Sequence, residues 1–286
     1  MCNLSRLVFQ VGFTLVGLAG CSQKPAPPPV FGGQGATVTA AKETPLPAES
    51  EKGKAQAGPC GGVSPASDAP LIDDFEDGDS KPFKAFQREG WWSSASDNTD
   101  GSKISPSGSF APDRLPSVQA TKSNIYAAHL TAQGQKQWGA TWGTTFRWVE
   151  KGIRCPFNAS GFAGIKFRAK GPGDIRVNFG IPDTVPRDDG GTCTERCWDS
   201  HGMSVHLTDR WDDYIVRWDR VQQGGWGTDA RFDPTRLLGL NFSVSTKDLP
   251  ADFWVDDIEF ISSQQANAPA AAPPEPGKPA KAPKGR

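Results

Sequence analysis

The fold is decided by the stretch IKFRAKGPGDIRVNFGI, residues 165–181. On both sides of its centre, apolar residues alternate with polar ones. This period of two is typical of a β-strand that buries one face and exposes the other. The Gly171-Pro172-Gly173 segment between the two halves is a turn signal. The stretch therefore predicts two strands joined as a β-hairpin.

The same alternation predicts strands along the rest of this region. They lie at residues 71–75, 90–94, 125–130, 138–148, 203–207, 214–218, 240–244 and 253–260. In the last strand the apolar phase changes at Asp256-Asp257, which predicts a β-bulge. The one good helix start is Asp233-Pro234, which leads to a single short turn through Leu237. Many short strands without long helices indicate an all-β sandwich.

Composition divides the chain into four parts. Residues 1–20 combine a basic start at Arg6 with an apolar stretch, as in a secretory signal peptide. Residues 21–69 and 264–286 are rich in proline, alanine and lysine and cannot bury enough apolar surface to fold, so we predict a disordered tether and a disordered tail. Residues 70–263 contain all ten tryptophans and form the predicted sandwich domain.

The end of the apolar stretch, Leu18-Ala19-Gly20-Cys21, resembles the bacterial lipobox. This resemblance implies that Cys21 is lipid-modified and becomes the mature N-terminus, so that acyl chains anchor the protein to a membrane. Ser22 rather than an aspartate follows, which favours the outer membrane. The alternative is an ordinary signal peptide with Cys21 as a bystander.

Four segments of the predicted domain resemble galactose-binding-like jelly rolls, in particular the family 11 carbohydrate-binding module. They are LIDDFEDG (71–78), GFAGIKFRAKG (161–171), LTDRWDDY (207–214) and FWVDDIEF (253–260). The resemblance implies a jelly-roll β-sandwich and a carbohydrate ligand. Glucan-binding members use tyrosines on their concave face, whereas this chain has only two tyrosines, so the resemblance does not transfer a sugar specificity.

The resemblance also implies a structural calcium ion, because in these jelly rolls calcium joins the first and last strands. By motif position Glu76 and Asp257 are the best candidate ligands, and Asp74 is a weaker one. Calcium prefers several oxygen ligands, including carboxylates. The alternative is that these acidic residues are solvated turn residues.

Four cysteines remain after Cys2 and Cys21 are set aside. We expect disulfides because an exported chain matures in an oxidising compartment. We favour Cys193 with Cys197 and Cys60 with Cys155, although three pairings are possible. The alternative is a zinc site built from Cys193, Cys197, His201 and His206.

Two tryptophans lie in loops where little would cover the ring. Trp198 is in a polar loop that ends at His201, and Trp226 is flanked by glycines. Indole rings offer apolar faces for sugars, so we predict Trp198 and Trp226 as ligand contacts, with His201 and Trp92 as further candidates.

These observations favour a non-catalytic, envelope-anchored module that binds a polysaccharide or another envelope component. One alternative is a structural or protein-interaction lipoprotein. Another is a glycan hydrolase or lyase on the same sandwich, with His201 and Asp199 as acid and base. The formal net charge is −1 and the domain has no basic stripe, so nucleic acid is not an expected partner.

Overall fold

The computed structural model describes residues 60, 69–85, 88–149, 153–245 and 250–267. The predicted signal peptide, Cys21, nearly all of the tether and most of the tail lie outside these residues. Among the residues that are described, no helix is both long and apolar enough to span a membrane.

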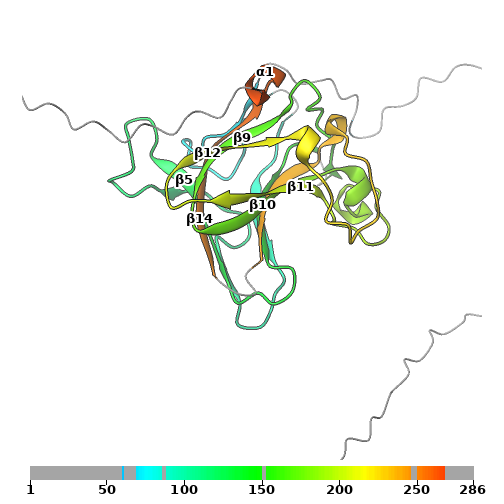
Figure 1. The fold of residues 1–286 in the computed structure, drawn as a ribbon, viewed down its shortest axis with the longest axis horizontal. Helices are drawn as coiled ribbons and strands as arrows, with labels where there is room; N and C mark the ends of the chain where they lie inside the picture. The colour runs from blue at the N-terminus through cyan, green and yellow to red at the C-terminus, as the bar shows by residue number, and fades with distance from the viewer. Residues whose placement is uncertain (1–59, 61–68, 86–87, 150–152, 246–249, 268–286) are drawn as a thin grey trace, which may run out of the picture. The chain divides into compact units, whose positions relative to one another are not determined.

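Two antiparallel β-sheets form the described part of the chain (Figure 1). The larger sheet has seven strands in the order β12-β9-β14-β5-β3, with β1 beside β14 and β4 beside β5. Its strands are β1 (Leu71–Asp73), β3 (Lys103–Ser105), β4 (Asp113–Arg114), β5 (Tyr126–Gln133), β9 (Gly164–Lys170), β12 (Asp212–Arg217) and β14 (Ala251–Ile261).

The smaller sheet has five strands in the order β11-β10-β13-β6-β2. Its strands are β2 (Trp92–Ser96), β6 (Ala140–Thr145), β10 (Gly173–Gly180), β11 (His201–Leu207) and β13 (Gly239–Val244). A separate ladder joins β7 (Trp148–Val149) to β8 (Ile153–Arg154).

The core lies between the inner faces of the two sheets. The Trp142 ring of β6 meets the Phe253 ring of β14 edge-on at 5.6 Å, and Phe167 of β9 meets Phe242 of β13 at 5.3 Å. The apolar residues of each alternating strand point into this core. The chain is therefore an all-β jelly-roll sandwich, and the predicted fold class is confirmed.

The predicted hairpin at residues 165–181 is wrong, although both of its strands form. β9 pairs with β12 and β14 in the larger sheet, whereas β10 pairs with β11 and β13 in the smaller one. The segment around Gly171 thus carries the chain from one sheet to the other. Alternation shows that a strand has one buried face, but it does not identify the strand's hydrogen-bonding partner.

Two local predictions for the second half of the domain are confirmed. The pairing of β14 with β9 shifts register between Asp256 and Glu259, and Asp257 has a φ of 47°, so the β-bulge is present. Asp233 caps the short 3-10 helix η5 (Pro234–Arg236) by accepting from the Thr235 N–H at 2.9 Å.

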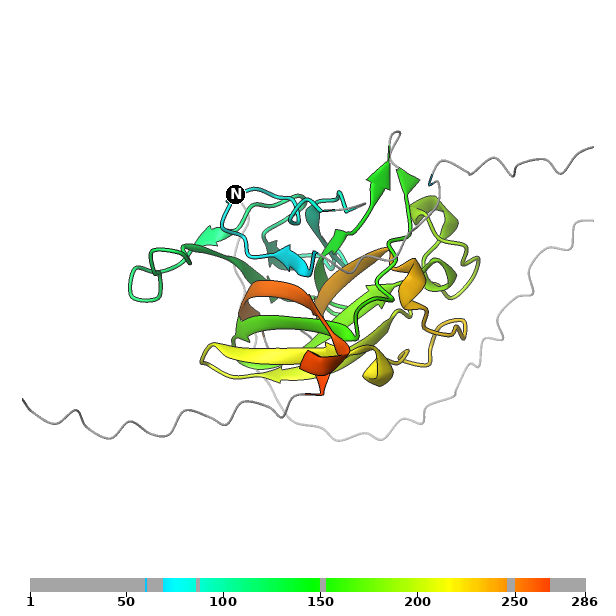
Figure 2. The ribbon, with the colours of Figure 1, turned by 90° about the horizontal axis from the view of Figure 1, so that it is seen from above.

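The ordered region continues beyond the predicted boundary at residue 263. A short helix, α1 (Ser263–Ala266), follows β14, and Ala266 is buried. Arg217 of β12 donates a 3.0 Å hydrogen bond to the Ala266 carbonyl, which holds α1 beside the larger sheet (Figure 2). The described residues also form the 3-10 helices η2 (Pro182–Thr184), η3 (Arg187–Asp189) and η4 (Trp218–Arg220).

Candidate functional site

Two disulfides close the predicted cysteine pairs, Cys60 with Cys155 and Cys193 with Cys197. The favoured pairing is therefore confirmed. The zinc alternative is wrong, because a metal ligand must be a thiolate and both sulfurs of the proposed site are bonded to each other. His206 forms a 2.8 Å contact with Asp174 instead.

One carboxylate organises the loops that carry Trp198 and Trp226. We call segments 193–199 and 222–230 the tryptophan loops. Asp199 accepts hydrogen bonds from the backbone N–H groups of Gly224, Gly225, Trp226 and Gly227 at 2.7, 2.8, 3.0 and 2.9 Å. Burial alone would raise the pKa of Asp199, but the four amides hold that pKa below its ordinary value. Asp199 is thus an ionised anchor.

Further contacts join the two tryptophan loops to each other. The Arg196 guanidinium donates to the Trp226 carbonyl at 2.9 and 2.6 Å, and the Thr228 hydroxyl donates to the Glu195 carbonyl at 2.6 Å. The Gln223 amide bridges the carbonyls of Asp199 and Thr228 at 2.8 and 2.9 Å. Because these contacts and the Cys193–Cys197 disulfide fix both backbones, a ligand would bind with little loss of loop entropy.

Both predicted loop tryptophans reach solvent. Trp198 is 50% exposed and Trp226 is 57% exposed. The Trp198 backbone has a φ of 75° and its N–H donates to the Thr184 carbonyl at 2.7 Å. Each indole is therefore presented on a fixed backbone. Their contact with a ligand stays a prediction.

Trp92 does not belong to this surface, and its predicted role as a ligand contact is wrong. The side chain is 1% exposed and packs against Phe75 and Phe110 in the core. Its indole N–H donates to Asp73 at 2.5 Å. The adjacent Trp91 is the one that faces outward.

His201 is buried beneath the tryptophan loops and its side chain is not accessible to a ligand. Its predicted role as a ligand contact is therefore also wrong. It is 5% exposed, and its Nε2 lies 2.9 Å from the Ala230 carbonyl. Burial lowers its pKa even though this hydrogen bond opposes the shift. Asp199 and His201 thus both hold the backbone of the tryptophan loops, and the hydrolase or lyase reading stays an alternative.

Polar side chains line the outer face of the smaller sheet beside these loops. The Arg176 guanidinium donates to the Gln222 carbonyl at 2.5 Å and to the Asn178 side-chain oxygen at 2.9 Å. The Asn178 amide donates to Ser243 at 2.9 Å, and Ser243 contacts Thr141 at 3.2 Å. We call this chain the polar ladder. It crosses β10, β13 and β6. No local sequence pattern marks it, because its members are up to 102 residues apart.

Two glycines beside the polar ladder leave room for asparagine side chains to lie flat on the sheet. A Cβ at Gly143 would lie 2.0 Å from the Asn241 side-chain oxygen, and one at Gly202 would lie 2.5 Å from that of Asn178. The amide side chains of these two asparagines therefore extend over neighbouring strands. Between Asn178 and Thr141 the outer face therefore offers hydrogen-bonding groups on short side chains.

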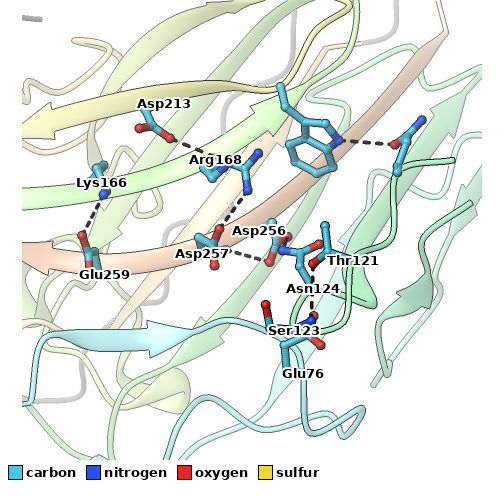
Figure 3. Close-up of polar contacts among 12 residues, drawn as sticks. Glu76, Thr121, Ser123, Asn124, Lys166, Arg168, Asp213, Asp256, Asp257 and Glu259 are labelled. Carbon is cyan, nitrogen blue, oxygen red and sulfur yellow. Dashed lines mark hydrogen bonds and ion pairs between the residues drawn. The ribbon is translucent and has the colours of Figure 1, made fainter. Parts of the chain in front are cut away.

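The outer face of the larger sheet is different, because its charges are paired (Figure 3). Arg168 lies 3.2 Å from Asp257 and 3.8 Å from Asp213, and Lys166 lies 3.0 Å from Glu259. A recess of about 560 Å³ lies at the edge of this sheet. It is lined by Lys103, Ile104, Ser105, Thr131, Ala132, Gln133, Pro250, Ala251 and Asp252, without a large aromatic ring.

The three calcium candidates lie near this network but already have protein partners. Glu76 accepts from the backbone N–H groups of Ile125 and Tyr126 at 2.8 and 3.0 Å, Asp257 pairs with Arg168, and Asp74 accepts from the Glu76 N–H at 3.3 Å. Within the described ranges, no three His, Cys, Asp or Glu side chains form a group that could hold a metal. These carboxylates therefore contact protein groups in the described structure, and calcium stays a prediction.

No protein-family model and no curated protein sequence matches this chain. Among solved structures, it is similar to the family 11 carbohydrate-binding module of a cellulosomal cellulase of Clostridium thermocellum. That match has 16% identity, covers 69% of this chain and 96% of that chain, and has a TM-score of 0.43. A family 30 carbohydrate-binding module matches with 20% identity, 71% and 91% coverage and a TM-score of 0.40.

An exo-β-agarase is also similar, at 9% identity and a TM-score of 0.41. This match covers 71% of the present chain but only 26% of the agarase. At these identities, the likenesses concern the sandwich fold alone.

Proposed function

We propose that this protein is an exported, non-catalytic carbohydrate-binding module. The observation that supports it is the pair of half-exposed indoles, Trp198 and Trp226, on loops fixed by Asp199. Sugars present C–H faces that pack on indole rings and hydroxyls that need hydrogen-bonding partners. The tryptophan loops would supply the first contact and the polar ladder the second.

Export and anchoring belong to the same proposal. The two disulfides are those of a chain that matures in an oxidising compartment. The lipobox-like Leu18-Ala19-Gly20-Cys21 then supports attachment to the cell envelope through lipid on Cys21, with the outer membrane favoured by Ser22. The polysaccharide would be one that reaches this surface.

Affinity electrophoresis tests the proposal. The mature chain carrying Cys21→Ser would be run through gels that contain mixed-linked β-1,3-1,4-glucan, agarose, xylan, polygalacturonate or dextran. At least one polysaccharide should retard it. Trp226→Ala and Trp198→Ala should each lower the affinity derived from that retardation at least tenfold, which corresponds to about 1.4 kcal/mol of binding free energy.

Val118→Ala is the matched surface control, because Val118 is exposed outside the tryptophan loops. Its retardation should equal that of the parent chain. Migration unaffected by all five polysaccharides would contradict the proposal, as would unchanged binding by both tryptophan variants. Co-purification of a protein partner through Trp198 and Trp226 would instead favour the protein-interaction alternative.

A further inference from the structure

Another exposed indole, Trp138, lies in the connection between β5 and β6. Its side chain is 54% exposed. The alternation of residues 138–148 predicted it as part of a strand, but β6 begins only at Ala140. Gly139 separates the two with a φ of 102°, and a Cβ there would lie 1.9 Å from the Val244 carbonyl oxygen. The backbone therefore leaves the strand path at Gly139, and Trp138 lies outside the strand.

A single carboxylate fixes the backbone on both sides of Trp138, as Asp199 does for Trp226. Asp97, which follows β2, accepts from the N–H groups of Gln137 at 2.8 Å and Gly139 at 3.1 Å. The same carboxylate accepts from the Thr99 N–H and hydroxyl at 3.0 and 2.7 Å. The Asp97 N–H in turn donates to the Gly139 carbonyl at 3.0 Å. Trp138 and Trp226 are thus each held by an aspartate from a distant loop.

Strand pairing places the two indole-bearing loops at opposite corners of the smaller sheet. The Trp226 loop joins the sheet where Gln222 pairs with Gly202, at the start of the edge strand β11. Gly202 is opposite Asn178, which is opposite Asn241 and then Gly143. The loop that carries Trp138 enters β6 at Ala140, three residues before Gly143. It therefore meets the sheet at the opposite end of the strands from the loop that carries Trp226. From the usual strand spacing and rise, these corners are on the order of 20 Å apart.

The polar ladder connects the two corners. It begins at the carbonyl of Gln222 in the Trp226 loop and ends at Thr141, three residues after Trp138. In Figure 1 the yellow-green and yellow loops to the right of β10 and β11 lie well apart from the teal and green loops at the bottom of the view. A hydrogen-bonding surface thus runs between two indoles.

We infer that Trp138 is a second stacking platform and that one glycan chain lies across the outer face of the smaller sheet, contacting both corners. This inference rests on the proposed function. The ligand would be a linear polysaccharide recognised over several sugar residues. Two linked contacts also strengthen binding, because the second forms at a high effective concentration once the first is made.

The polysaccharide that most retards the parent chain in the five-gel panel provides the probe, together with its oligosaccharides of two to eight residues. In the parent chain, affinity should rise with length until both corners are spanned. Trp138→Ala should lower polysaccharide affinity at least tenfold and end this rise at shorter oligosaccharides. Asp97→Ala should have the same effect with the indole still present, because Asp97 positions the loop.

Trp211→Ala, on the outer face of the larger sheet, is the matched tryptophan control and should bind as the parent does. Melting curves of all three variants would establish that they fold. Equal binding by Trp138→Ala and the parent would overturn the inference and leave the proposed function standing. Retardation by none of the five polysaccharides would overturn both.

Discussion

The two outer faces of the sandwich use tryptophan in different ways. On the smaller sheet the exposed indoles lie on loops at the corners, around a low polar surface. On the larger sheet Trp254 stacks on His129 at 4.1 Å, and the Lys170 ammonium lies 5.3 Å from the rings of both Trp254 and Trp211. These indoles are half-buried and their faces have protein partners. What covers a ring therefore decides whether it can serve a ligand.

The strongest test of this comparison sets a core indole against a loop indole. Trp142 is fully buried against Phe253. Trp142→Ala should lower the free energy of unfolding by about 3 to 5 kcal/mol through lost burial and the cavity left behind. Trp226→Ala should change it by only about 0.5 kcal/mol, as expected of a surface site. Urea denaturation measures both, and equal losses would make Trp226 a structural residue.

The two disulfides offer a second comparison, because one lies outside the tryptophan loops and the other lies within them. Cys60–Cys155 spans 95 residues and Cys193–Cys197 spans 4. Cross-linking restricts the unfolded chain more when the closed loop is longer. The double variant Cys60→Ala/Cys155→Ala should therefore lose about 2 to 4 kcal/mol of stability. Cys193→Ala/Cys197→Ala should lose less, but should weaken polysaccharide retardation because the Trp198 loop is released.

Retardation by the Cys193→Ala/Cys197→Ala variant equal to that of the parent would show that the hydrogen bonds of Asp199, Arg196 and Gln223 hold the tryptophan loops without the disulfide. A loss of stability larger than that of the Cys60→Ala/Cys155→Ala variant would contradict the chain-entropy argument. Affinity electrophoresis measures the first outcome, and thermal melting under non-reducing conditions measures the second.

The sequence predicted the strands well because alternation is a local signal. It could not assign β9 and β10 to different sheets, since that depends on partners far along the chain. Nor could it show which of Trp91 and Trp92 faces the core, because adjacent strand residues point in opposite directions. The Asp97 and Asp199 anchors were missed for a related reason. Their hydrogen bonds reach residues 25 to 42 positions away, and no pattern marks them.

Asp256 of the larger sheet and Asp199 of the tryptophan loops should make stability depend on pH in opposite directions. Burial raises the pKa of Asp256 to about 7, against a hydrogen bond from Asn124. The folded chain then holds this proton between about pH 4 and 7 while the unfolded chain has lost it, so Asp256 makes stability fall as pH rises through that window. Asp199 has a lowered pKa, and its contribution is lost as pH falls below about 4.

The variant Asp256→Asn isolates the first effect. From pH 5 to 8 the parent should lose at least about 1 kcal/mol relative to this variant, since one pKa unit is worth about 1.4 kcal/mol. Chemical denaturation at both pH values measures the difference. A difference that is independent of pH would show that Asp256 is ionised throughout this range.

The smallest effect is expected from uncovering an indole on the larger sheet. His129 covers one face of Trp254 and contacts Asp252 at 2.8 Å and Asp113 at 3.4 Å. His129→Ala should cost about 0.5 to 1 kcal/mol, the range for one partly exposed aromatic contact. It should also leave polysaccharide retardation unchanged. The freed face of Trp254 would lie among paired charges such as Arg168 with Asp257, without the polar ladder that accompanies Trp226 and Trp138. If His129→Ala instead binds a polysaccharide more tightly, an uncovered indole suffices for binding, and the fixed loops and polar ladder of the smaller sheet are not required.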